Sequence, residues 1–167
     1  METELFDESW IGKVISFTEP NARWRLTEKL RDKNDQFSAG EINDFPDAVS
    51  GAYGTFECEN VDCHTELAIM RIAMQFPHAG ANPNSFARQA SHNLPSCGQL
   101  MLDAYGTFRT RECESAARLL HMKRGWQDHT GMLPGGSILY LLIEKAPGKQ
   151  LDSAGFWDLR RRERDKI

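Results

Sequence analysis

Four cysteines and five histidines are the side chains of this 167-residue chain best suited to bind a metal ion or to form disulfides. The cysteines fall at irregular spacings: Cys58, Cys63, Cys97 and Cys113. Structural zinc sites usually draw ligands from closely spaced pairs such as C-x-x-C, and no such pair occurs. His121 and His129 have no second histidine or carboxylate at metal-ligand spacing, so we interpret them as surface or loop residues. The pattern predicts no metal site and reduced, mostly buried thiols.

The composition is that of a globular protein, with 40% hydrophobic residues, 26% charged residues and a formal net charge of -4. A negative net charge argues against a general surface for nucleic acid, so we expect no such partner. Met1 to Glu4 is acidic where a secretory signal would be basic, and no apolar run reaches membrane-spanning length. We therefore expect a cytoplasmic protein, with a nuclear location left open, without a membrane partner or an oxidising compartment for disulfides.

The segment from Leu133 to Leu151 is expected to organise the fold. Six consecutive apolar or aromatic residues, Ile138 to Ile143, lie between a Pro-Gly-Gly turn and a Glu-Lys pair. A short run that is apolar throughout and bounded by glycine and proline is typical of an inner strand covered on both faces; the middle of a buried helix is the alternative. Because side chains alternate along a strand, Leu141 and Leu142 are predicted to point to opposite faces, both buried.

Further elements are expected around this strand. Residues 51–60 and 66–76 favour strands. Two short helices are predicted over residues 86–93 and 97–105, each preceded by a serine that is a candidate N-cap. Apolar and charged residues between positions 21 and 31 alternate in a way that favours an amphipathic helix.

These elements predict an α+β fold, with an antiparallel sheet of four to five strands and one or two packed helices. The expected division of the chain has three parts: an N-terminal helical extension over residues 1–36, a main unit over 37–150, and a segment over 151–167 in which a further helix starts.

Three motifs follow one another along the main unit. They are G-A-Y-G-T-F from Gly51, A-I-M-R-I from Ala68, and L-L-I-E-K-A-P-G from Leu141. In this order they resemble the small, N-terminal lobe of fungal protein kinase-like and aminoglycoside phosphotransferase-like proteins, over roughly residues 45–155. Residues 156–165 are similar to the segment that follows the hinge in that group. The resemblance implies a family of ATP-dependent phosphotransferases that use Mg²⁺.

In that family a glycine-rich turn covers the nucleotide phosphates, a strand lysine contacts them, and the hinge backbone holds the adenine ring. The resemblance thus implies these cofactor-binding residues: Gly51, Tyr53, Gly54, Arg71, Glu144, Lys145 and Ala146. Arg71 stands where the lysine is expected and replaces a compact ammonium with a planar fork. Alternatives are an ordinary hairpin turn at the glycines and an arginine that only projects to solvent. No glutamate lies on the predicted helix to pair with Arg71, so Gln99 or Asp103 is the nearest polar candidate.

The chain ends at Ile167, before the catalytic loop and metal-binding aspartate that the family carries in its large lobe. We therefore expect a truncated, pseudokinase-like domain without catalytic residues or enzymatic activity of its own, which binds ATP and Mg²⁺ weakly or acts through protein contacts. One alternative is a phosphotransferase whose large lobe comes from a longer isoform or another chain. The other is an unrelated α+β interaction domain. Exposed apolar surface on the cleft face, near Tyr53, Ile69 and Ile143, predicts a protein partner or self-association.

Overall fold

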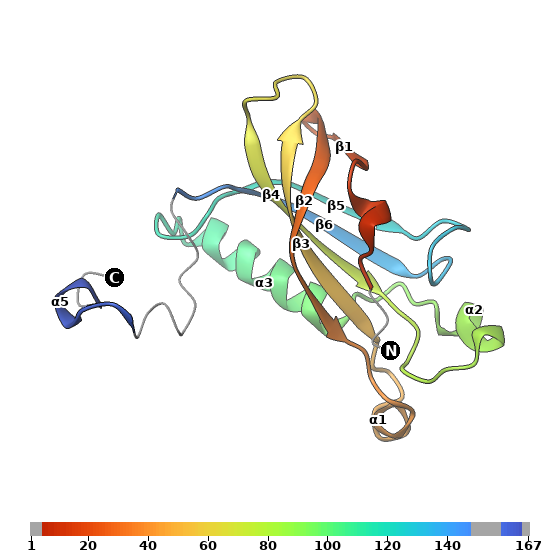
Figure 1. The fold of residues 1–167 in the computed structure, drawn as a ribbon. Coiled ribbons are helices and arrows are strands. Elements are labelled where there is room, and N and C mark those ends of the chain that lie inside the picture. Colours follow the sequence, from red (N-terminus) through yellow and green to blue (C-terminus); the bar gives the residue numbers. More distant parts are fainter. Residues whose placement is uncertain (1–4, 148–157, 165–167) are drawn as a thin grey trace.

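One six-stranded antiparallel sheet carries the fold in this computed structural model, which describes residues 5–147 and 158–164 (Figure 1). The strands are β1 (Val14–Thr18), β2 (Asn21–Asp35), β3 (Gly51–Asn60), β4 (Leu67–Gln75), β5 (Leu119–Trp126) and β6 (Ser137–Glu144). Their order is β1-β2-β3-β4-β6-β5, with all neighbours antiparallel. The α+β class and the antiparallel sheet are as predicted, with six strands in place of four or five.

The helices lie in the connections and after the sheet. They are α1 (Ala39–Asp44), α2 (Phe86–Gln89), α3 (Ser96–Thr110) and α5 (Arg161–Arg164), with 3₁₀ turns η1 (Glu8–Trp10) and η2 (Pro83–Ser85). The long helix α3 lies across one face of the sheet (Figure 1) and extends beyond its predicted range of 97–105. Of the predicted C-terminal segment, residues 151–157 and 165–167 lie outside the described residues. No helix in the described ranges is long and apolar enough to cross a membrane.

Strand β2 replaces the predicted N-terminal helix, so that prediction was wrong. Trp24 and Leu26 are buried in the sheet, whereas the residues next to them face away from the core. This period of two is interrupted further on, where β-bulges lie between Leu26 and Glu28 and between Lys29 and Arg31. Strand pairing with β1 and β3 fixes the extended conformation. The N-terminal residues described here are therefore part of the main sheet and not a separate helical extension.

The two outer strands of the sheet approach each other, so the sheet curls nearly into a barrel. The ammonium of Lys123 on β5 donates a hydrogen bond to the Ser16 carbonyl oxygen on β1 at 3.1 Å. Beside it the His121 ring stacks on Phe17, with 4.9 Å between ring centroids. One hydrophobic core lies inside this curl, and a second lies between the outer face and α3.

Strand β6 is the inner strand that the apolar run predicted, since it pairs with β4 on one side and β5 on the other. Leu141 and Leu142 are both 0% exposed. Leu142 belongs to the core inside the curl, and Leu141 belongs to the core beneath α3. The prediction that both side chains are buried on opposite faces of one strand is confirmed.

Candidate functional site

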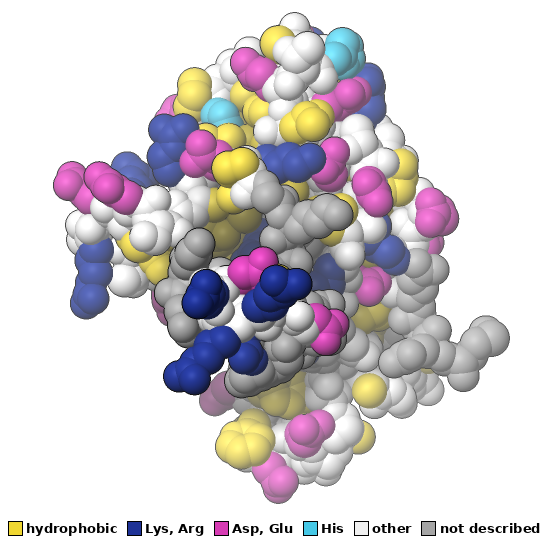
Figure 2. Space-filling view, turned by 60° about the vertical axis from the view of Figure 1, so that its left-hand side comes forward, with side chains coloured by type: hydrophobic (Ala, Val, Ile, Leu, Met, Phe, Trp, Pro, Cys, Tyr) yellow, Lys and Arg dark blue, Asp and Glu magenta, His cyan; other side chains and the backbone are white. Residues whose placement is uncertain are grey.

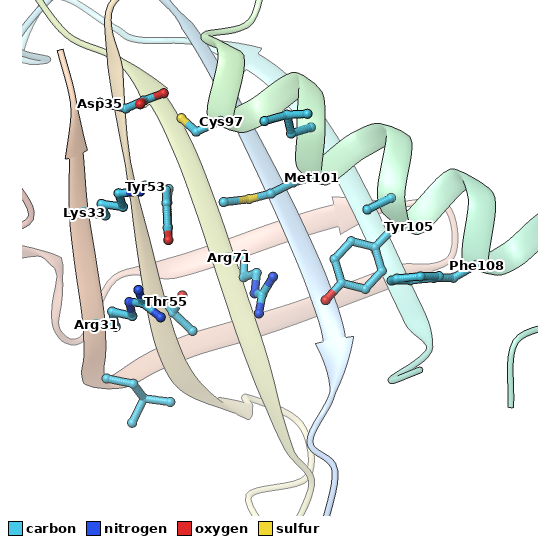
Figure 3. Close-up of a pocket in the computed structure, with 13 residues that line it drawn as sticks. Arg31, Lys33, Asp35, Tyr53, Thr55, Arg71, Cys97, Met101, Tyr105 and Phe108 are labelled. Carbon is cyan, nitrogen blue, oxygen red and sulfur yellow. The ribbon is translucent and has the colours of Figure 1, made fainter. Parts of the chain in front are cut away.

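A groove of about 790 Å³ lies between α3 and the part of the sheet formed by β2, β3 and β4 (Figure 3). Its floor includes Arg31, Thr55 and Arg71, which the strand register places side by side on three neighbouring strands. The wall opposite is one face of α3, formed by Cys97, Leu100, Met101, Ala104, Tyr105 and Phe108. We call this hollow the α3 groove.

Three cations line the α3 groove and one carboxylate accompanies them. Arg31 and Lys33 come from β2, Arg71 comes from β4, and Asp35 is the only acidic residue among the described residues of the lining. None of the three cations takes part in the ion pairs found among the described residues. The lining thus carries three positive charges against one negative charge, whereas the chain as a whole has a net charge of -4. This local excess favours an anionic ligand.

The groove's positive charge is not a general property of the molecular surface. Seen from the side on which α5 lies, several basic side chains gather at the centre, and basic, acidic and apolar side chains are mixed around them (Figure 2). Some basic residues elsewhere on the sheet have acidic partners, as in the ion pair of Arg23 with Asp62, whose Nη2 and Oδ1 atoms are 2.6 Å apart. Others, Lys123 and Arg124 on β5, donate hydrogen bonds to backbone carbonyl oxygens. The α3 groove thus gathers three basic side chains that have no ion pair among the described residues.

Arg71 is the most constrained of the three cations. It is half-buried, and its Nε atom is buried without a hydrogen-bond partner among the described residues. Leaving a buried donor unpaired costs about 1–3 kcal/mol, and more for a charged group. Figure 3 shows the guanidinium in the space between β3 and Tyr105 of α3. The alternative in which Arg71 merely projects to open solvent is therefore not what the structure shows.

Tyr105 is the helix residue that lies against Arg71, with the guanidinium carbon 5.9 Å from the centroid of its ring. Gln99 and Asp103, the residues expected from the sequence, instead bond to each other at the exposed side of α3, with Nε2 and Oδ1 2.8 Å apart. Burial raises the pKa of Tyr105 and the charge of Arg71 lowers it, with the net shift upward. Tyr105 is therefore a neutral hydroxyl at neutral pH.

Tyr105 was not among the site residues predicted from the sequence, although its spacing along the helix indicates it. It follows Cys97 and Met101 at intervals of four residues, so the three lie on one face of α3. At one end of the groove, burial and then the charge of Asp35 raise the pKa of the Cys97 thiol to about 12. That thiol is protonated at neutral pH and is no nucleophile.

Gly51 and Gly54 lie inside strand β3 and form no turn, so the predicted glycine-rich turn was wrong. Both positions need glycine for packing reasons. A Cβ atom on Gly51 would collide with the ring of Pro95, and one on Gly54 would lie 2.7 Å from the Phe56 ring. Tyr53 lies on the same face of β3 as Gly51, opposite to Gly54, and lines the α3 groove.

The residues expected to form a hinge lie at the end of β6 and do not line the α3 groove. The Glu144 carboxylate accepts hydrogen bonds from Arg118, which lower its pKa. The Lys145 ammonium is 2.5 Å from the Glu57 carboxylate, and Ala146 is exposed. Of the seven predicted cofactor-binding residues, the structure thus brings Tyr53 and Arg71 together in one groove.

Metal-ligating side chains and thiols complete the chemistry of residues 5–147 and 158–164. There, no group of three or more histidine, cysteine, aspartate or glutamate side chains is arranged to hold a metal ion. Cys58 and Cys97 are buried, and Cys63 and Cys113 are exposed, all with free thiols. Comparisons of the chain with protein-family models, curated proteins and solved structures give no match. The kinase-like resemblance accordingly has no support from these comparisons.

Proposed function

We propose that this chain is a binding domain that holds a phosphate-bearing ligand, a nucleotide first of all, in the α3 groove and performs no phosphoryl transfer. The observation that carries the proposal is the set of three cations without ion-pair partners among the described residues: Arg31, Lys33 and Arg71. An anion in this groove would accept hydrogen bonds from all three groups. The stabilisation would be largest for Arg71, because its buried Nε has no hydrogen-bond acceptor among the described residues.

The chemistry of the lining suits a phosphate ester of an aromatic compound. Guanidinium groups bind phosphate oxygens through two parallel N–H donors, and Arg31 and Arg71 flank the hydroxyl of Thr55 across three strands. Tyr105 and Phe108 offer aromatic surface on the opposite wall, with their ring centroids 5.8 Å apart. A volume of about 790 Å³ lies within the ordinary range of small-molecule sites.

The lack of transfer activity is proposed from the carboxylates of the groove. Phosphoryl transfer needs a metal held by carboxylates and an acidic residue that orients the acceptor hydroxyl. Asp35 is the one carboxylate that the described part of the chain brings to the groove, and it lies at the end where Cys97 packs. A kinase-like ancestry also remains a proposal. It is supported by the succession β4, α3, β5, β6, in which β6 pairs between β4 and β5.

The test is a calorimetric titration of the protein with ATP, ADP and inorganic pyrophosphate, each with and without Mg²⁺. We expect binding by the wild type and a loss of about tenfold to a hundredfold in Arg71→Gln, because charge-assisted hydrogen bonds contribute roughly 1.5–3 kcal/mol. Arg23→Gln is the matched control, since Arg23 lies on β2 outside the groove. Equal affinity of all three proteins, or no binding by the wild type, would refute the proposal. If the wild type releases phosphate from ATP and Arg71→Gln does not, the proposed absence of catalysis is refuted.

A second candidate function, docking of a protein partner, is favoured by the apolar rim of the same groove. Leu30, Leu100 and Phe108 are 48%, 69% and 39% exposed. The patch differs from the one expected, because Ile143 is only 5% exposed and is buried in the core beneath α3. Sedimentation velocity over a range of concentrations checks self-association through this rim. A concentration-dependent dimer that Leu100→Ser dissociates supports this function, and a monomer at all concentrations argues against self-association.

A further inference from the structure

A separate hollow of about 440 Å³ lies between the N-terminal segment before β1 and the loop that follows β5. It shares no lining residue with the α3 groove. The aromatic side chains of its lining include Trp10, Trp126 and Tyr140, and its acidic ones are Asp7 and Asp128. We call it the β1–β5 pocket.

Both carboxylates of the β1–β5 pocket are held in place by their own turns. Asp7 Oδ1 accepts a hydrogen bond from the Ser9 amide at 3.0 Å, and Asp128 Oδ1 accepts one from the Thr130 amide at 2.8 Å. Hydrogen bonds to the Ser9 and Thr130 hydroxyls contribute most to lowering the pKa of the two carboxylates. Two fixed negative charges therefore persist at the pocket at any pH near neutrality.

The pocket already holds one cation against an aromatic ring. The ammonium of Lys13, which is itself a lining residue, lies 4.0 Å from the centroid of the Trp10 ring. An ammonium at this distance is attracted by the negative face of the ring. Lys13 thus shows that the walls of the pocket accept an ammonium ion.

Two further rings line the pocket: Trp126 is open to a second cation, and Tyr140 already has the Lys123 ammonium 5.9 Å from its ring centroid. Trp126 is 52% exposed, and it meets the His92 ring edge-on, with 4.6 Å between ring centroids. Tyr140 lies on β6, and the charge of Asp128 affects its hydroxyl strongly enough to help raise the pKa of that group to about 12, after the larger effect of burial. A carboxylate and two aromatic rings therefore lie along one pocket.

We propose that the β1–β5 pocket binds a small organic ammonium ion, of the kind carried by choline or by a methylated lysine side chain. The rings of Trp126 and Tyr140 contact its N-methyl or methylene groups, and Asp7 and Asp128 balance its charge. Lys13, whose charge acts on Asp7, competes with this ligand for that carboxylate. The proposal is independent of the α3 groove, because the two sites have no residue in common.

The probe is choline, and its neutral isostere 3,3-dimethylbutan-1-ol is the ligand control. Binding is followed by saturation-transfer NMR of the ligand methyl groups and by the indole N–H signal of Trp126. We expect saturable binding of choline and about tenfold weaker binding of the isostere, since a desolvated cation–π contact contributes up to about 2 kcal/mol. Equal binding of the two ligands, or no saturable binding of choline, would overturn the proposal.

Protein variants test the assigned roles. Asp128→Asn and Trp126→Leu should each weaken choline binding several-fold, Trp126→Phe should retain it, and Lys13→Gln should strengthen it. Asp44→Asn is the matched control, because Asp44 is an exposed carboxylate on α1 outside the pocket. If Asp128→Asn binds choline as the control does, while both unfold at the wild-type temperature, the assignment is overturned. A trimethyllysine peptide and free choline, compared on the wild type, distinguish a protein-borne ammonium from a free one.

Discussion

Arg71 and Tyr105 face each other across the α3 groove, with the guanidinium carbon 5.9 Å from the centroid of the tyrosine ring. One residue comes from the middle of β4 and the other from the middle of α3. The ring covers part of the cation without providing a hydrogen-bond acceptor for its buried Nε. In its unliganded form the groove therefore contains a charged donor that is held in place but not satisfied. Such a group stabilises a bound anion more than it stabilises the fold.

The first prediction separates these two effects. Arg71→Met should raise the free energy of unfolding of the unliganded protein by about 1 kcal/mol, because it removes a buried donor without a partner and keeps the apolar stem. The same variant should lose binding of ATP and pyrophosphate. Urea unfolding, with and without pyrophosphate, measures both quantities. If the variant is instead less stable than the wild type by a similar amount, Arg71 has a structural role that the static contacts do not reveal.

The second prediction concerns the two cores that share strand β6. Leu141→Ala and Leu142→Ala should each lower the free energy of unfolding by about 2–5 kcal/mol, since both side chains are fully buried. Leu100→Ala is the control for a leucine of α3 that is 69% exposed, and it should change stability by no more than about 0.5 kcal/mol. Chemical denaturation checks all three variants. A small effect at either β6 position would mean that one core is less tightly packed than its burial indicates.

Local patterns in the sequence were sufficient where one residue type fits one environment. The apolar run of β6 has no polar face, so an inner strand was the natural interpretation, and the structure agrees. The helical interpretation of β2 failed because Trp24, Leu26 and Leu30 are spaced by two and then by four residues. That spacing fits a helix face as well as a strand interrupted by β-bulges. Only pairing with β1 and β3, which is not local, decides between them.

The α3 groove could not be predicted from the sequence, because strand pairing that is not local brings its residues together. Arg31 and Arg71 are 40 positions apart, and they lie in one row only because the register of β2, β3 and β4 aligns them with Thr55. Arg31 was assigned to a helix face on the basis of the residues around it. Arg71 was identified because its neighbours in the A-I-M-R-I motif resemble a known phosphate-binding strand. A motif can thus indicate one residue of a site, whereas the residues that surround it depend on tertiary register.

The third prediction tests what the glycines of β3 do. Gly51→Ala should be destabilising, because the new methyl group would meet the Pro95 ring and lie 2.9 Å from the Met74 carbonyl oxygen. Gly106→Ala is the control for a glycine position that has room for a methyl group. It lies in the interior of α3 with nothing within 4 Å of a new methyl group, so it should stabilise by up to about 1 kcal/mol. Thermal unfolding compares the two variants. If Gly51 belonged to a phosphate-binding turn instead, Gly51→Ala would keep normal stability and lose nucleotide binding.

The fourth prediction is that acid destabilises the protein through His78. The Ser50 hydroxyl oxygen accepts a hydrogen bond from the Phe37 amide at 2.8 Å and lies 2.7 Å from Nδ1 of His78. Either Nδ1 of His78 or the Ser50 hydroxyl can donate this hydrogen bond, depending on the tautomer of the neutral ring. Burial lowers the pKa of His78 in the folded protein below its ordinary value of 6.5. The folded state thus binds fewer protons than the unfolded state as the pH falls.

The stability that the neutral His78 ring contributes is present above the ordinary histidine pKa and is lost as the pH falls through the lowered pKa of the folded state. The free energy of unfolding should therefore decrease between about pH 7 and pH 5. His121 adds to this decrease, since burial also lowers its pKa and its Nδ1 has no partner in the described structure. Urea denaturation at several pH values measures the slope. His78→Gln should reduce it, and His129→Gln, at an exposed position, should leave it unchanged. A slope that is the same in all three proteins would show that His78 is protonated equally in the folded and unfolded states.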